Sequence, residues 1–206
     1  AFTWDELCDW YLEFSKGTLY GDDAPEAAKQ GARHTLWTVF QSLARLIHPI
    51  MPFISEEIWQ QLPHTDGSIV TAAYPKTGDF PSDPEALDKV ATTQGVITAI
   101  RRIRADMEIS PRIPVQIYTE DISQIQGHKS ALRDLAGVHG MTEGKHDGPA
   151  STFVVRGQAY FLPLEGVVDV DAERTRLDKV LAKVGEDLHF LERKLGNTNF
   201  TDRAPG

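Results

Sequence analysis

Basic and aromatic side chains that could contact a nucleic acid occur in three places along this 206-residue chain. Arg33, His34 and Trp37 lie within about one helical turn, so two basic groups would stand beside a ring able to stack on a base. Arginine and lysine contact phosphates through charge-assisted hydrogen bonds. The sequence therefore predicts nucleic-acid contacts at these three residues and at two further groups: Arg101, Arg102 and Arg104, and Arg174, Arg176, Lys179, Lys183, Arg193 and Lys194.

Motifs that mark an active site are missing from the sequence. Gly127-His128-Lys129-Ser130 lacks the preceding glycine of a phosphate-binding loop, and Lys76-Thr77-Gly78 has no accompanying Ser-x-x-Lys. The single cysteine, Cys8, excludes an internal disulfide and a zinc site built on two or more cysteines. We predict no catalytic, cofactor-binding or metal-binding residue in this chain.

Several of these side chains also have a structural interpretation. A solvent-exposed helix face is the alternative for the arginines at 101, 102 and 104. His48 precedes a proline at the end of a helical pattern, which favours a helix cap over a general base. Aromatic residues at helical spacing belong more often to a core than to a binding surface, so we expect Trp4, Trp10 and Trp59 to be buried. Trp37 lies to one side of its apolar stripe and remains the candidate for stacking.

The overall charge limits how a nucleic acid could bind. The net charge is −9, and residues 1–30 hold seven acidic against two basic residues, whereas residues 172–206 hold six acidic against seven basic. Phosphate binding needs Lys and Arg, so binding is expected at a local basic surface. The chain has no apolar run of about 20 residues and no secretory leader. We therefore expect a cytoplasmic protein with no membrane partner.

Helical patterns run through residues 1–110. A capping box at Thr3-Trp4-Asp5-Glu6 precedes apolar residues at helical spacing, up to Gly17 and Gly21. A second helix is expected from Pro25 to the prolines at 49 and 52, and a third after it with Ser55 near its start. After a loop from 63 to 84, a fourth helix is predicted to bury Leu87, Val90, Ile97, Ile100 and Ile103. These segments predict an α-helical bundle.

The remaining residues predict a small α+β subdomain at 111–170 and a single long helix at 171–206. The subdomain should contain a strand at 113–118, a helix at 122–135 and a hairpin joining 153–155 to 159–162. The long helix carries a heptad seam, which needs a second helix to cover it. Half of an antiparallel arm fits best, and the fold class is mainly α. The seam residues are Leu177, Leu181, Val184, Leu188, Leu191 and Leu195.

Four stretches resemble one protein family. Residues 4–13 and His48-Pro49-Ile50-Met51-Pro52-Phe53-Ile54-Ser55-Glu56-Glu57-Ile58-Trp59 look like the anticodon-binding bundle shared by valyl-, isoleucyl-, leucyl- and methionyl-tRNA synthetases. Residues 100–111 and 160–166, which lead into the heptads, narrow the resemblance to the valyl-tRNA synthetase family. Isoleucyl relatives typically end in a cysteine-rich zinc module, which one cysteine does not fit.

The resemblance implies a non-catalytic, carboxy-terminal part of a class I aminoacyl-tRNA synthetase. The longer protein would ligate valine to tRNA with ATP and Mg2+, in a catalytic domain whose signatures are absent here, and would be a monomer. This part would dock the anticodon stem-loop and the tRNA body, beside its own catalytic domain. The family's first bundle helices would precede Ala1. Two alternatives stay open: a protein-interaction module that pairs through its heptad helix, and the same region of an isoleucyl or leucyl enzyme.

Overall fold

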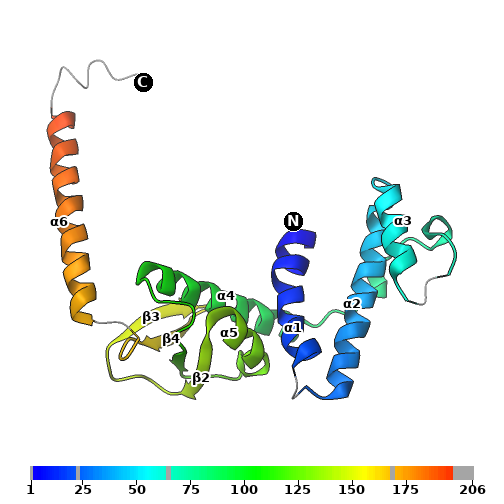
Figure 1. Cartoon of the computed structure of the whole chain (residues 1–206), viewed down its shortest axis with the longest axis horizontal. Helices are drawn as coiled ribbons and strands as arrows, with labels where there is room; N and C mark the ends of the chain where they lie inside the picture. The colour runs from blue at the N-terminus through cyan, green and yellow to red at the C-terminus, as the bar shows by residue number, and fades with distance from the viewer. Residues whose placement is uncertain (1, 22–23, 64–65, 168–169, 197–206) are drawn as a thin grey trace.

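The computed structural model describes residues 2–21, 24–63, 66–167 and 170–196, and describes residues 170–173 by their backbone alone. Figure 1 shows helices α1 to α3 on the right, a small sheet with α4 and α5 in the middle, and α6 standing apart on the left. The predicted fold class, mainly α with a small α+β part, is confirmed. Among the described helices, none is long and apolar enough to cross a membrane.

The first helical stretch begins with π-helical winding, η1 (Phe2–Tyr11), and continues as α1 (Leu12–Tyr20). Trp4 is 71% exposed, so the prediction that it lies in the core is wrong. A π-helix bonds each amide five residues back, so residues spaced for an α-helix do not stay on one face. Gly17 allows α1 to approach the helix α5 closely, because a Cβ at this position would lie 2.7 Å from Ser130 Cβ.

Two further helices, α2 (Glu26–Ile47) and α3 (Pro52–Gln61), flank the predicted proline break. His48 is the C-cap residue of α2, as predicted. Ser55 lies near the start of α3, as predicted, in a helix that begins at a proline whose ring suits the first turn. Ser55 is buried, with its Oγ 2.7 Å from the carbonyl oxygen of Met51 and 2.8 Å from His48 Nδ1.

A four-stranded sheet follows, with the strand order β2-β1-β4-β3. β1 pairs with β2 in parallel, and the other two pairs are antiparallel. The predicted strand and hairpin are confirmed, and Arg156 and Gly157 turn the hairpin with φ of 50° and 85°, as the primed turns of hairpins require. The strand β2 was not predicted from the sequence. The strands are β1 (Val115–Thr119), β2 (Val138–Glu143), β3 (Ala150–Val155) and β4 (Gln158–Pro163).

Short helices occupy the connections. The predicted loop at 63–84 contains two 3-10 turns, η2 (Ile69–Thr71) and η3 (Thr77–Asp79). Of the helix expected at 122–135, the structure forms η4 (Gln126–His128) and α5 (Lys129–Ala136). Gly137 ends α5 in the left-handed conformation, with φ of 69°, which a glycine adopts without a steric penalty.

The fourth long helix, α4 (Pro84–Asp106), packs against α5 and β3. Its residues Ile97 and Ile100 are fully buried in one core with the strands and α5, as Ile117 and Leu132 are. The core therefore continues across the predicted boundary at residue 110, since α4 packs on the strands and on α5. The prediction that Leu87 faces inward is also wrong: the residue is 66% exposed.

The last helix, α6 (Val170–Leu195), confirms the predicted long helix. Every seam residue in it is about half exposed or more, from 50% at Leu177 to 71% at Leu181. Within the described residues no other helix covers the seam. One hydrogen bond that joins α6 to the rest of the fold runs from Arg176 Nη2 to the carbonyl oxygen of Asp106, the last residue of α4. The expected residues 197–206 of the arm lie outside the described residues.

Candidate nucleic-acid interface

The first predicted group lies on the middle of α2. The rings of His34 and Trp37 stack with their centroids 5.9 Å apart and their planes 25° apart. Trp37 Nε1 donates a hydrogen bond of 2.7 Å to the carbonyl oxygen of Pro63, which fixes the indole against the end of α3. Arg33 is exposed and pairs with Glu26 at 2.9 Å. A base would therefore meet the exposed imidazole of His34 first, backed by the half-buried indole.

Beside this pair lies a hollow of about 380 Å³, lined by apolar and aromatic side chains from α1, α2 and the end of α3. Arg33 is the cation in the lining of this hollow. Tyr20 also lines it and is 80% exposed. Aromatic faces beside a cation suit unpaired bases, because every base has a π-face and every nucleotide carries a phosphate. The α2 group is thus suited to a single-stranded loop.

The second predicted group divides into one structural and two surface residues. Arg104 is 7% exposed, and its guanidinium donates to the carbonyl oxygens of Ala136 at 3.0 Å, Ser110 at 2.8 Å and Ile113 at 2.7 Å. Burial lowers the pKa of this guanidinium, but arginine remains charged at neutral pH. Arg104 therefore ties α4 to α5 and β1, which corrects its prediction as a phosphate contact.

Arg101 and Arg102 remain on the surface at the end of α4. Arg101 Nε donates to the carbonyl oxygen of Leu135 at 2.7 Å, so its guanidinium is held at the edge between α4 and α5. The side chain of Arg102 is 84% exposed, and the contact with Asp106 is long, at 3.8 Å. An exposed pair of this kind is worth about 0–1 kcal/mol. Arg102 is therefore readily redirected to a phosphate.

The third group lies on α6, and most of it shares one face. At 100° per residue, Lys179, Lys183 and Arg193 fall on the side of α6 opposite the leucine seam, together with Glu186. Arg176 and Lys194, five full turns apart, lie at the edge of that face, and Lys194 Nζ is 4.5 Å from the ring centroid of Phe190. Arg174 falls on the same side as the leucine seam instead, three residues before Leu177. A helix with one apolar and one basic side can pair with a partner helix and meet phosphates at the same time.

Phe190 also belongs to this outer face and is not among the residues predicted from the sequence. It stands between Lys183 and Arg193 at helical spacing and is 48% exposed. An exposed aromatic ring among cations is a surface on which a base or a ribose could pack. A signal was available in the sequence, because residues 176, 179, 183, 190 and 193 follow the same spacing as the seam.

The fold brings two of the three groups together. The Arg176–Asp106 bond places the base of α6 at the end of α4, so the basic face of α6 begins beside Arg102. The α2 group lies at the other end of the molecule, beyond α1 in Figure 1. The two regions could therefore contact only different parts of an extended partner.

Another hollow, of about 890 Å³, is lined mainly by apolar side chains of η1, α1, α2 and α4. His128 reaches it, with Nδ1 3.0 Å from Thr93 Oγ1, and burial, followed by the charge of Lys89, lowers the pKa of this imidazole. Among the described residues, no group of three His, Cys, Asp or Glu could hold a metal ion.

Comparison with protein families gives two matches. Residues 1–119 match the anticodon-binding domain of tRNA ligase, and residues 169–206 match the valyl tRNA synthetase tRNA binding arm. The chain belongs to the anticodon-binding domain family of tRNA ligases. The anticodon-binding match ends at Thr119, the last residue of β1. The match therefore extends past the predicted boundary at residue 110.

Several curated relatives of this chain are valine–tRNA ligases. It is 37% identical over 215 residues to that of Syntrophotalea carbinolica, covering 100% of this chain and 24% of the relative. It is 38% identical over 217 residues to that of Stenotrophomonas maltophilia, covering 99% and 23%. A third, from Geobacillus stearothermophilus, is 36% identical over 212 residues, covering 99% and 24%. The chain spans about a quarter of the length of these relatives and corresponds to their carboxy-terminal part.

Proposed function

We propose that this chain is the tRNA-binding, carboxy-terminal region of a valine–tRNA ligase and that it carries no catalytic group of its own. The observation that supports this most directly is the two-sided helix α6, with cations on its outer face in the region that matches the tRNA binding arm. Cations aligned along one helix face suit a line of phosphates, because each can neutralise one phosphate and release a counterion.

The whole protein would ligate valine to its tRNA. ATP and Mg2+ would bind in the part of that protein outside this chain. This chain would be covalently continuous with that part and would make further contacts with the tRNA. The longer protein would act as a cytoplasmic monomer. In this proposal α2 meets the anticodon loop through His34 and Trp37, whereas α6 meets the body of the tRNA through Lys179, Lys183 and Arg193. The 206-residue chain alone should show no ATP–pyrophosphate exchange.

Replacing the outer-face cations tests the proposal. The variant Lys179→Ala, Lys183→Ala and Arg193→Ala should bind a valine-accepting tRNA transcript more weakly than the unchanged chain. The slope of log Kd against log salt should fall by about 0.7–0.9 for each phosphate that the variant no longer neutralises. These side chains are exposed, so the fold should persist. Arg176 is left in place because it bonds the end of α4.

A matched control removes the same charge elsewhere. The side chains of Lys16, Lys76 and Lys145 are exposed and lie outside the three predicted groups. Their triple alanine variant has the same net charge as the test variant and should keep the original slope. Equal weakening in both variants, or equal affinity of the chain for tRNA and for heparin, would show that only net charge matters and would refute specific docking.

The exposed seam supports a second candidate, a protein-interaction module. Six exposed apolar residues at heptad spacing favour pairing with another helix. Sedimentation equilibrium distinguishes the two candidates. A stable dimer that ignores tRNA would favour the interaction module, whereas tRNA binding with the predicted salt slope would favour the tRNA-binding region.

A further inference from the structure

Residues 120–168 lie between the two matched ranges, and neither family match covers them. This segment contains α5, β2, β3 and β4. Two hollows open beside α5: one of about 310 Å³ above β2, and one of about 800 Å³ between α5 and the end of α4. Arg133 and His139 line both hollows, so the two adjoin and form one surface, which we call the α5 cleft.

The α5 cleft is positively charged, whereas the chain as a whole has a net charge of −9. Its lining contains five residues that are cationic at neutral pH and two carboxylates, Glu108 and Asp134. The local balance is therefore +3, from five minus two. Such a concentration of one sign attracts an anionic partner even to an acidic protein. The cations are Arg101, Arg104, Arg112, Lys129 and Arg133.

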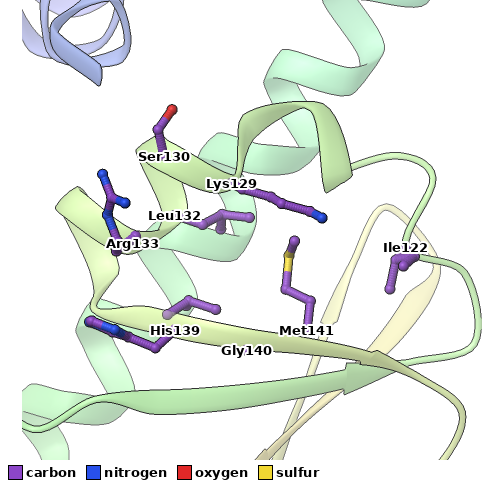
Figure 2. Close-up of a pocket in the computed structure, with 9 residues that line it drawn as sticks. Ile122, Lys129, Ser130, Leu132, Arg133, His139, Gly140 and Met141 are labelled. Atoms are coloured by element: carbon purple, nitrogen blue, oxygen red, sulfur yellow. The ribbon is translucent and has the colours of Figure 1, made fainter. Parts of the chain in front are cut away.

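Figure 2 shows the smaller hollow, which is lined by two of these cations, Lys129 and Arg133. Lys129 and Arg133 both project from α5, one turn apart, with Lys129 extending over Met141. Arg133 and His139 lie at the opposite end of the hollow, His139 on β2. The smaller hollow therefore has a cation at each end, and its walls contain no carboxylate.

Two of the arginines in the cleft are already held in place. Arg101 donates its Nε to the carbonyl oxygen of Leu135, and Arg133 its Nε to Asp134 at 2.9 Å. The Nη groups of a guanidinium fork are donors that suit an oxyanion. Because the side chains are partly ordered before binding, less conformational entropy is lost when an anion arrives. Arg104 adds its charge from beneath, at the base of the larger hollow.

The cleft also adjoins the basic face of α6. Arg176 bonds the last residue of α4, and Glu108 and Arg112, which line the larger hollow, follow that residue closely in the chain. Cations thus continue from α6, past the end of α4, to α5. A continuous surface of this kind fits a partner with many phosphates better than it fits a single small anion.

We infer that the α5 cleft binds the RNA backbone and is a third phosphate-binding surface for the tRNA, in addition to those on α2 and α6. This inference rests on the proposed function, since it takes the same tRNA as the ligand. The contact is mainly electrostatic, because the lining offers five cations and, among aromatic rings, the imidazole of His139. Arg112 and Lys129 are the residues that would contact phosphates most directly.

The test is a pair of double variants of the full chain. Arg112→Ala with Lys129→Ala removes two cleft cations, and Lys76→Ala with Lys145→Ala removes two exposed cations that line neither hollow. Binding of the tRNA transcript is measured across a range of salt concentrations. With two phosphates no longer neutralised, the cleft variant should bind roughly 20- to 60-fold more weakly at about 0.1 M salt, with a slope smaller by about 1.4–1.8. The control should match the unchanged chain.

Protection of lysines from amine acylation gives a second measurement on the unchanged chain. Bound tRNA should protect Lys129 and leave Lys145 reactive. If the unchanged chain binds no tRNA, the proposed function fails and this inference fails with it. If the chain binds, the α6 variant weakens, and the cleft variant behaves like its control with Lys129 unprotected, this inference alone is overturned.

Discussion

Arg104 provides the sharpest test of the reasoning, because one residue carries two opposed interpretations. As a phosphate contact, it would affect RNA binding and leave the fold unchanged. As a structural residue, it holds the carbonyl oxygens of Ala136, Ser110 and Ile113 with one guanidinium. We expect Arg104→Ala to destabilise the α+β unit strongly.

The magnitude follows from the burial of the three acceptors. The bond to Ala136 is buried, whereas those to Ser110 and Ile113 are partly buried, so water can replace the guanidinium there in part. A buried acceptor left unpaired costs about 1–3 kcal/mol, and a net hydrogen bond elsewhere about 0.5–1.5 kcal/mol. Together these give a destabilisation of roughly 2–6 kcal/mol. At about 2 kcal/mol per M of urea, the unfolding midpoint should fall by about 1–3 M.

Urea unfolding followed by circular dichroism measures this shift. Arg104→Lys keeps the charge but not the planar fork, so it should lose an intermediate amount of stability. Arg102→Ala is the matched control: its side chain is 84% exposed, and a change at such a surface position should stay within about 0.5 kcal/mol. An unchanged midpoint in Arg104→Ala, combined with a smaller salt slope for tRNA binding in the folded protein, would refute the structural assignment.

Two further predictions concern packing and pH. Gly17→Ala should destabilise the chain, because the new Cβ would lie 2.7 Å from Ser130 Cβ. Gly31→Ala in α2 meets nothing within 4 Å and should stabilise the chain by about 0.5–1 kcal/mol. Thermal unfolding of both variants measures the difference, and equal effects would contradict the prediction. Folding lowers the pKa of His128 through burial, so the unfolded chain binds the proton more readily; stability should be fully present above about pH 6.5 and should fall as the pH drops through the folded-state pKa. Thermal unfolding at pH 7.5 and 5.5 measures this pH dependence of stability. The variant His128→Gln should show a smaller pH dependence. A similar reduction in His139→Gln would count against the assignment of the effect to His128.

The elements that the sequence predicted well are those whose signal is local. The prolines around His48 end one helix and begin the next wherever the chain is placed, because a proline removes a donor and restricts its neighbour. Arg156 and Gly157 turn the hairpin for a similar reason. The heptad spacing of α6 likewise needs no tertiary contact to be recognised.

The failures have a common cause in packing between distant segments. β2 lacks clear alternation and forms as the parallel neighbour of β1, a pairing that joins residues far apart in the chain. The apolar pattern of α4 fits a bundle and a sheet equally well, and only the tertiary structure places Ile97 and Ile100 against the strands. Trp4 is exposed because the winding of η1 rotates it away from the predicted face.

For the candidate site, the sequence by itself determined which residues carry charge and that the cations of α6 recur at helical spacing. It could not tell Arg104 from Arg101 and Arg102, because burial depends on the carbonyl oxygens that α5 and the start of β1 bring to one side of α4. The α5 cleft was beyond prediction for the same reason. Its cations come from α4, the segment after it, and α5, and they form one surface only when these elements pack together.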